Sequence, residues 1–319
     1  MPPLYPLRFE PILRRYVWGG RRLESLGKRL GEGDDYAESW ELCDRADDQS
    51  VVAEGPLKVV TLGQLVREQG PMLFGRHHPQ PRFPLLVKLL DAHRRLSLQV
   101  HPDDARAARL VPLDLGKTEA WVVLAAEPGS VIYAGLKRGF DRHALEREVV
   151  RGTAELCLHK FEPRAGDCVF LPAGALHALG EGLVVAEIQQ SSDVTYRLFD
   201  WNRMGVDGKP RALHVEQALQ AIDFRLGPID PVTPTAGETA GVDRLVECEK
   251  FVLERWRLDG MRSTGGDDRC RVLMVLEGAI EVAETPPATR GTTLLLPAGL
   301  GAVEVRTCPA ATVLCAYLP

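Results

Sequence analysis

Two segments of the chain repeat one pattern, and this repeat constrains the fold more than any other feature. GDCVFLPAGALH at 166–177 aligns without a gap with GTTLLLPAGLGA at 291–302. In each copy a glycine precedes an apolar run typical of a buried strand, and Pro-x-Gly then turns the chain out of that strand at a position that favours a positive φ. Two copies of one β unit predict two similar barrels.

The two copies differ at a position that matters for chemistry. The first copy ends in His177, whereas the second has Ala302 at the aligned place. A metal ligand at this position is therefore available only in the first copy. We expect the second barrel to lack a metal site and to pack against the first domain or another subunit.

The length of 319 residues also favours two domains, because single hydrophobic cores tend to divide as chains approach this size. Between residues 224 and 240 the text RLGPIDPVTPTAGETA is polar, contains three prolines and shows no periodicity, which is typical of a linker. We predict a metal-binding catalytic domain over 1–230, with short helical elements, and a second domain without metal ligands over 231–319.

Short strand-like runs bounded by Gly, Pro, Asp or Asn dominate the chain, and helical signals are few. This balance predicts a mainly β fold of barrel or sandwich type. The expected strands are 83–90, 94–100, 119–124, 168–171, 183–189, 271–282, 293–296 and 312–317, and the expected helices are 21–30, 61–70, 141–151 and 215–222.

Charge and composition exclude several classes of protein. The chain has 39 Lys and Arg against 44 Asp and Glu, a net charge of −5, and neither half has the basic excess of a nucleic-acid-binding protein. No apolar stretch approaches the roughly 20 residues that span a bilayer, and the start lacks a signal-peptide core, so we expect a cytoplasmic protein without membrane contact. The seven cysteines form no CxxC pair, which argues against a disulfide framework and a thiolate zinc site.

A metal site is indicated by the run RRLSLQVH at 94–101. In a strand, alternate side chains share a face, so Ser97, Gln99 and His101 should point the same way. On the next strand Glu119 can supply a carboxylate, and His177 lies just after a turn at a barrel rim. Two imidazoles, one carboxylate and one amide oxygen suit Zn²⁺, or else Mn²⁺, Co²⁺ or Fe²⁺. We therefore predict one divalent metal, held by Gln99, His101, Glu119 and His177.

These motifs carry a family resemblance. G-x5-P-x-G-x2-H is similar to the second cupin motif, and QVHPDD, LGKTEAW, LPAGALHAL and QQSSDVTYRLFDWNR together resemble the short bacterial form of type I mannose-6-phosphate isomerase. VWGG at 17–20 and AESWEL at 37–42 also fit. The resemblance implies two cupin-type, double-stranded β-helix (jelly-roll) barrels, and in that family the metal is usually zinc, held at the positions of the same four residues. It also implies a phosphorylated hexose substrate.

The activity implied by the resemblance is the interconversion of mannose 6-phosphate and fructose 6-phosphate, in which a proton moves between C1 and C2 through a cis-enediolate. Glu187, which shares a strand face with Val185 and Gln189, is a candidate base, although a carboxylate paired with a neighbouring Arg inside the barrel is the alternative. Lys117 and Arg197 match family positions for the cations that the phosphate and the enediolate require, unless Lys117 is merely solvated or Arg197 is a structural ion-pair partner.

Further residues are candidates for binding the sugar. Trp18, Glu38 and Trp40 resemble family residues that line the sugar pocket, where an aromatic face could pack on a hexose, but core packing is an equal alternative. Ser97 could contact phosphate or serve as a small filler residue. Two other functions stay open from sequence: a non-catalytic cupin that binds sugar or regulates, and an Fe²⁺ oxygenase, which Gln99 as a fourth ligand disfavours. The oligomeric state could be monomer or homodimer.

Overall fold

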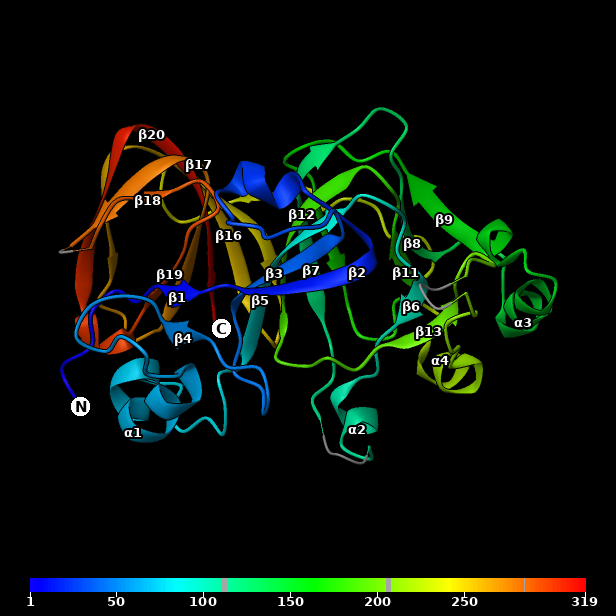
Figure 1. Cartoon of the computed structure of the whole chain (residues 1–319), viewed down its shortest axis with the longest axis horizontal. Helices are drawn as coiled ribbons and strands as arrows, with labels where there is room; N and C mark the ends of the chain where they lie inside the picture. The colour runs from blue at the N-terminus through cyan, green and yellow to red at the C-terminus, as the bar shows by residue number, and fades with distance from the viewer. Residues whose placement is uncertain (111–113, 205–207, 284) are drawn as a thin grey trace.

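The protein folds into two barrel-like β bodies that lie side by side (Figure 1). The computed structural model describes residues 1–110, 114–204, 208–283 and 285–319, apart from the side chain of residue 308. Strand predominates over helix, which confirms the predicted mainly β, cupin-type fold.

The body nearer the chain start is built from two antiparallel sheets. In the larger sheet the order is β10-β7-β12-β5-β3-β2, and in the smaller it is β13-β6-β11-β8-β9. The strands of the larger sheet are β2 (Ile12–Gly20), β3 (Tyr36–Leu42), β5 (Leu85–Ala92), β7 (Glu119–Ala126), β10 (Cys168–Leu171) and β12 (Leu183–Gln190). Those of the smaller sheet are β6 (Leu98–Val100), β8 (Ile132–Leu136), β9 (Leu158–Phe161), β11 (His177–Leu179) and β13 (Tyr196–Phe199).

The second body comes from the end of the chain. Its strands follow the order β14-β15-β16-β20-β17-β18, and β19 also pairs with β17. They are β14 (Thr235–Ala236), β15 (Val242–Glu247), β16 (Val252–Gly265), β17 (Arg271–Val282), β18 (Ala288–Thr289), β19 (Thr293–Leu296) and β20 (Ala302–Tyr317). Beside this body, β1 (Phe9–Glu10) pairs with β4 (Val51–Val52).

Helices are short, as predicted. Asp141 caps α3 and Thr61 caps α1 by accepting hydrogen bonds from backbone N–H groups. The helices are α1 (Leu62–Phe74), α2 (Asp104–Ala107), α3 (Arg142–Val150) and α4 (Val215–Ala221), with 3₁₀ turns η1 (Arg22–Leu26), η2 (Ala154–Cys157) and η3 (Ala298–Leu300). The helix expected over 21–30 is wrong, because only a 3₁₀ turn forms before Gly27 adopts a positive φ of 72°.

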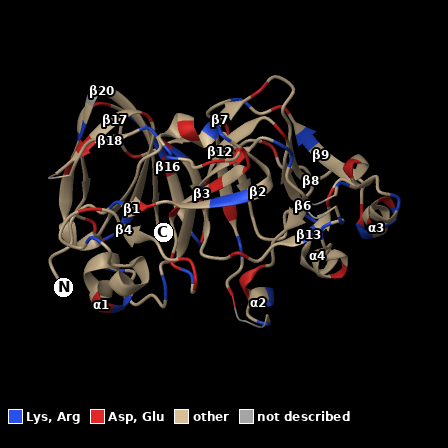
Figure 2. Cartoon of the chain, viewed as in Figure 1, with Lys and Arg blue, Asp and Glu red and all other residues tan. Residues whose placement is uncertain are grey.

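A shared core joins the two bodies. On β7, Ala120 and Val122 pack in a cluster that includes Val272 and Met274 of β17, whereas Trp121 points into the first barrel. Alternate side chains of β7 therefore face the interface between the two bodies and the interior of the first barrel. Charges of both signs are distributed over both bodies, with basic β2 beside acidic β3 (Figure 2).

The structure differs from the sequence-based expectations at one glycine and two strands. Gly174 has φ of +88°, as Pro-x-Gly predicted, but its counterpart Gly299 lies in η3 without a positive φ, so that expectation is wrong for the second copy. The strand expected over 94–100 is confirmed only at Leu98–Val100, because before Ser97 the chain makes single backbone hydrogen bonds, from Arg94 to Trp18 and from Leu96 to Leu179, instead of a continuous strand pairing. β20 begins at residue 302 rather than 312, so it runs through a segment with no clear alternation.

Candidate metal centre and active site

Three of the predicted ligands meet inside the first barrel. His101 follows β6, Glu119 begins β7 and His177 begins β11. Nε2 of His177 lies 3.2 Å from Oε1 of Glu119, and Nε2 of His101 lies 3.6 Å from Oε2 of the same carboxylate. All three side chains are almost completely buried, and their ligand atoms lie within 4.8 Å of one another. This arrangement can surround one cation.

The hydrogen bonds of the two imidazoles leave their metal-facing atoms free. Nδ1 of His101 is 2.9 Å from the carbonyl oxygen of Val194, and Nδ1 of His177 is 2.9 Å from that of Ala175. These contacts place the proton on Nδ1 and the lone pair on Nε2. In the described part of the chain, neither Nε2 and neither oxygen of Glu119 has a hydrogen-bond partner. Oε2 of Glu119 does have an ion-pair partner, Nζ of Lys117 at 3.0 Å. Buried polar atoms without partners are costly, and a bound metal would satisfy the two Nε2 atoms and Oε1 of Glu119.

Electrostatics also favour a cation at this place. Burial lowers the pKa of His177 to about 4 and that of His101 well below its ordinary value, so both imidazoles are neutral, as metal ligands must be. Burial raises the pKa of Glu119, although Lys117 opposes this shift. The carboxylate thus sits where a positive charge would stabilise its ionised form.

Gln99, the fourth predicted ligand, lies directly opposite His177 where β6 pairs with β11. On its other side β13 places Arg197 opposite the same glutamine. Residues directly opposite in an antiparallel pair share one face of the sheet, so Gln99, His177 and Arg197 line one side. Its role as a ligand stays a prediction.

A buried row of charges adjoins the three ligands. Nζ of Lys117 is 3.0 Å from Glu119 and 3.9 Å from Oε1 of Glu187, so the alternative of a solvated Lys117 is wrong. Oε2 of Glu187 accepts a hydrogen bond of 3.0 Å from the Trp121 indole, while its Oε1 has no hydrogen-bond partner. Nζ of Lys88 lies 3.4 Å from both Glu187 and Glu38.

Lys88 was missed by sequence reasoning. It is 3% exposed in the middle of the apolar strand β5, and its ammonium also lies 5.0 Å from the Trp40 ring centroid. Burial lowers its pKa, but Glu38 and Glu187 outweigh that effect and raise it. Burial raises the pKa of Glu187, but Lys88 and Lys117 lower it by more. The pKa of Glu187 therefore lies below its ordinary value. A single lysine within LLVKLLDA was the available signal, because a buried charge needs a partner.

The remaining predicted residues lie in two settings. Trp18 and Trp40 are buried, Trp18 stacks on Tyr16 at 5.6 Å, and Trp40 donates a hydrogen bond to Glu38. Ser97 is also buried, at 6% exposure. Arg197 is partly buried and donates to the carbonyl oxygen of Ala212, while its Nε has no partner among the described residues. None of these contacts decides between substrate binding and packing.

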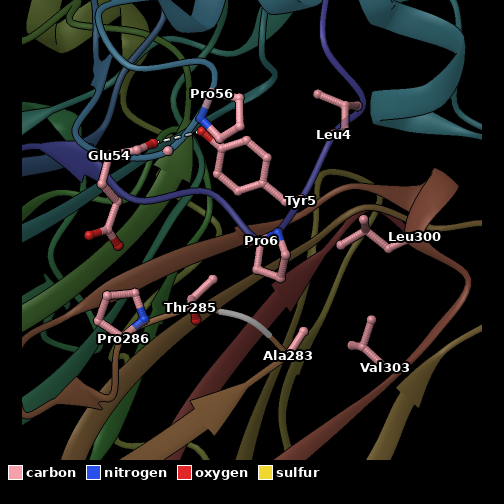
Figure 3. Close-up of a pocket in the computed structure, with 11 residues that line it drawn as sticks. Leu4, Tyr5, Pro6, Glu54, Pro56, Ala283, Thr285, Pro286, Leu300 and Val303 are labelled. Carbon is pink, nitrogen blue, oxygen red and sulfur yellow. Dashed lines mark hydrogen bonds between the residues drawn. The ribbon is translucent and has the colours of Figure 1, made fainter.

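A cavity of about 630 Å³ lies elsewhere, between the chain start and the second body (Figure 3). Leu4, Tyr5 and Pro6 face Ala283 and other residues of the second body across it. Among the described residues that line it, there is no histidine and Glu54 is the only carboxylate. Its lining therefore lacks the groups that proton transfer or metal binding requires, and we do not assign the catalytic chemistry to it.

Comparisons with known proteins identify the family. The model of the phosphomannose isomerase type I catalytic domain matches residues 7–118. A mannose-6-phosphate isomerase of Bacillus subtilis is 34% identical over 303 residues, which are 93% of this chain and 94% of that protein. The chain belongs to the type I phosphomannose isomerase family.

Other members of the type I phosphomannose isomerase family agree. The mannose-6-phosphate isomerase of Streptococcus mutans is 35% identical over 260 residues, covering 80% of this chain and 79% of that protein. The crystal structure of a mannose 6-phosphate isomerase from Bacillus subtilis matches with a TM-score of 0.90 and 29% identity, over 99% of this chain and all of that one. In the ranges that the structure describes, no helix is long and apolar enough to cross a membrane.

Proposed function

We propose that this protein is a metal-dependent isomerase that interconverts mannose 6-phosphate and fructose 6-phosphate. The observation that carries this proposal is the convergence of three buried atoms without hydrogen-bond partners, Nε2 of His101, Nε2 of His177 and Oε1 of Glu119, beside Oε2 of Glu119, whose neighbour is the Lys117 ammonium at 3.0 Å. Similarity to mannose-6-phosphate isomerases over more than nine-tenths of the chain supports the choice of substrate.

His101, Glu119 and His177 would hold one divalent metal, with Gln99 as a fourth ligand. Two imidazole nitrogens and two oxygens suit Zn²⁺, with Mn²⁺, Co²⁺ and Fe²⁺ as alternatives. When bound, such an ion stabilises negative charge that develops on the carbonyl and hydroxyl oxygens of the sugar. The carbonyls of Val194 and Ala175 fix the tautomer and orientation of the two imidazoles.

Glu187 is the proposed base for the proton that moves between C1 and C2. Its Oε1 is free of hydrogen bonds, whereas the Trp121 indole holds Oε2 and thereby fixes the direction of the carboxylate. Removal of the C2 proton from the aldose gives the cis-enediolate, and return of the proton to C1, with transfer of the hydroxyl proton from O2 to O1, gives the ketose. Lys88, at 3.4 Å, keeps Glu187 ionised and ready to accept the proton.

Lys117 and Arg197 are the proposed cationic groups. Lys117 lies between Glu119 and Glu187, where its ammonium would stabilise charge on the reacting oxygens. The planar fork of Arg197, with its unpartnered Nε, suits the phosphate or a pair of sugar oxygens, and Ser97 would assist. We propose that Trp18, Glu38 and Trp40 line the sugar pocket.

The other expectations follow from this proposal. The catalytic unit would span residues 1–230, and 231–319 would form the second cupin-like domain. A monomer or homodimer acting in the cytoplasm fits such an enzyme of sugar metabolism. A non-catalytic sugar-binding cupin would need no buried carboxylate held ionised by two lysines beside the metal ligands, so Glu187 favours catalysis over that alternative.

A coupled assay tests the proposed function. Fructose 6-phosphate formation is measured by the reduction of NADP⁺ through phosphoglucose isomerase and glucose-6-phosphate dehydrogenase. We expect turnover of mannose 6-phosphate, and a kcat/KM for free mannose, measured by chromatography of the fructose formed, that is at least about a hundredfold lower, because two charge-assisted contacts to phosphate would be lost. Equal rates for both sugars, or no turnover of either by metal-loaded protein, would overturn the assignment.

A further inference from the structure

The second barrel contains a polar cavity of its own. Its volume is about 440 Å³, which lies within the range of small-molecule sites. Arg244, Glu254 and Trp256 line it together with Arg262, Arg269 and Tyr317. The repeat in the sequence allows this cavity to be compared, residue by residue, with the metal centre of the first barrel.

Strand register shows which residue replaces each ligand. Leu171 of the first repeat pairs with Glu119, and the aligned Leu296 of the second repeat pairs with Arg271. Arg271 therefore stands in the second barrel where the carboxylate ligand stands in the first. Ala302 also replaces His177. The second barrel therefore has the guanidinium of Arg271 at the place where the first barrel would bind a metal ion.

The same comparison places a carboxylate where the first barrel has Lys88. Lys88 pairs with Glu187 on the strand next to β7, and Glu254 pairs with Cys315 on the strand next to β17. The two positions correspond, because Glu187 lies two residues before Gln189, which pairs with Glu119, and Cys315 lies two residues before Tyr317, which pairs with Arg271. The charges at these two places are thus reversed between the barrels.

Most charges that line the cavity are already paired. Glu254 accepts hydrogen bonds from Arg244, from the Trp256 indole at 2.9 Å and from the Tyr317 hydroxyl at 3.0 Å. Arg271 makes two contacts of 2.6 and 2.7 Å with the carboxylate of Asp267. Because these charged groups already have partners in the protein, they do not by themselves indicate a bound ligand.

Two arginines are different. In the part of the chain that the structure describes, Nε of Arg262 and Nε of Arg269 are buried without hydrogen-bond partners. Arg262 stacks on Trp256 at 4.6 Å and reaches only the hydroxyl of Thr239, while Arg269 comes no closer than 3.9 Å to Asp267. The guanidinium of Arg269 also lies over an aromatic ring, 5.5 Å from the centroid of Tyr317, so an aromatic side chain helps to hold each of the two groups in place. Their free donors require an acceptor.

We propose that this cavity binds a small organic anion, through a phosphate or carboxylate group held by Arg262 and Arg269. A planar guanidinium that is stacked on an aromatic ring is suited to either group. The hydroxyls of Ser263 and Thr264, which also line the cavity, can bond to hydroxyl groups of the ligand. The site is independent of the isomerase chemistry proposed for the first barrel.

Calorimetric titration of the full-length, metal-loaded protein with glucose 6-phosphate and, separately, with citrate tests this site and distinguishes the two anion classes. The matched variants are R262Q with R269Q, which remove the two free donors, and R306Q, which removes an exposed arginine of the same barrel. We expect at least one of the anions to bind the wild type and R306Q alike, and the double variant at least tenfold more weakly. Tenfold is about 1.4 kcal/mol.

A second variant keeps the test decisive if the double variant does not fold. R262K retains the charge but loses the planar fork, so it should weaken binding of the same anion while the melting temperature without ligand stays close to that of wild type. Equal binding of both anions by wild type, R262K and R262Q/R269Q, or no anion binding beyond the first barrel, would overturn the proposal. Neither result bears on isomerase activity, which the coupled assay measures separately.

Discussion

H177A is expected to lose the bound metal and to lower kcat/KM for mannose 6-phosphate by at least about a thousandfold, since a catalytic metal supplies several kcal/mol of transition-state stabilisation. The physical reason is that His177 supplies one of only two imidazole nitrogens in the cluster. Its loss leaves an empty space beside Oε1 of Glu119, where the imidazole nitrogen of His177 lies 3.2 Å away in the wild type. Elemental analysis and the coupled assay on the same preparation measure both effects.

H143A is the matched control for this variant. His143 is 88% exposed on α3, so the same substitution removes an imidazole without touching the barrel interior. We expect this control to keep wild-type metal content and activity. If H177A retained one metal per chain and full activity, the assignment of His177 as a ligand would be wrong.

E187Q is expected to keep the metal but to lower kcat by about a hundredfold to ten-thousandfold, the range typical for removal of a general base. Glutamine has nearly the same shape, and its amide oxygen can still accept the hydrogen bond from Trp121. It cannot take a proton from carbon. Steady-state kinetics with mannose 6-phosphate, together with elemental analysis, separates this loss from a loss of metal.

Lys88 is the cation that supports Glu187 as the base, because its own pKa is raised and it stays protonated. It lies 3.4 Å from Glu187 and is buried on the same barrel face. E304Q, at an exposed position of β20, controls for the loss of a carboxylate and should leave kinetics unchanged. If E187Q were as active as E304Q, Glu187 would not be the base that moves the proton.

Much of the candidate site could be predicted because its residues obey strand alternation. Glu119 and Trp121 point into the barrel, as the period of two requires, and Glu187 faces Trp121 across the next strand pair. The repeat also predicted β10 and β19 with their observed bounds. In these strands local pattern and tertiary packing agree, so the sequence alone is informative.

Other features depend on contacts that a single segment does not encode. Lys88 looks like an interruption of an apolar strand until Glu38 and Glu187 are placed beside it from distant parts of the chain. The cavity in the second barrel was also missed, because a lost histidine was interpreted as a lost site. Only the register of β17 with β19 shows that Arg271 replaces Glu119.

The most direct test of the metal centre is a titration of chelator-stripped enzyme with Zn²⁺, followed by the coupled assay. We predict that stripped protein is inactive and that activity returns linearly until one ion per chain is bound, in the wild type but not in H177A. Full activity in protein that elemental analysis shows to be free of metal would contradict the central claim that His101, Glu119 and His177 hold a catalytic ion.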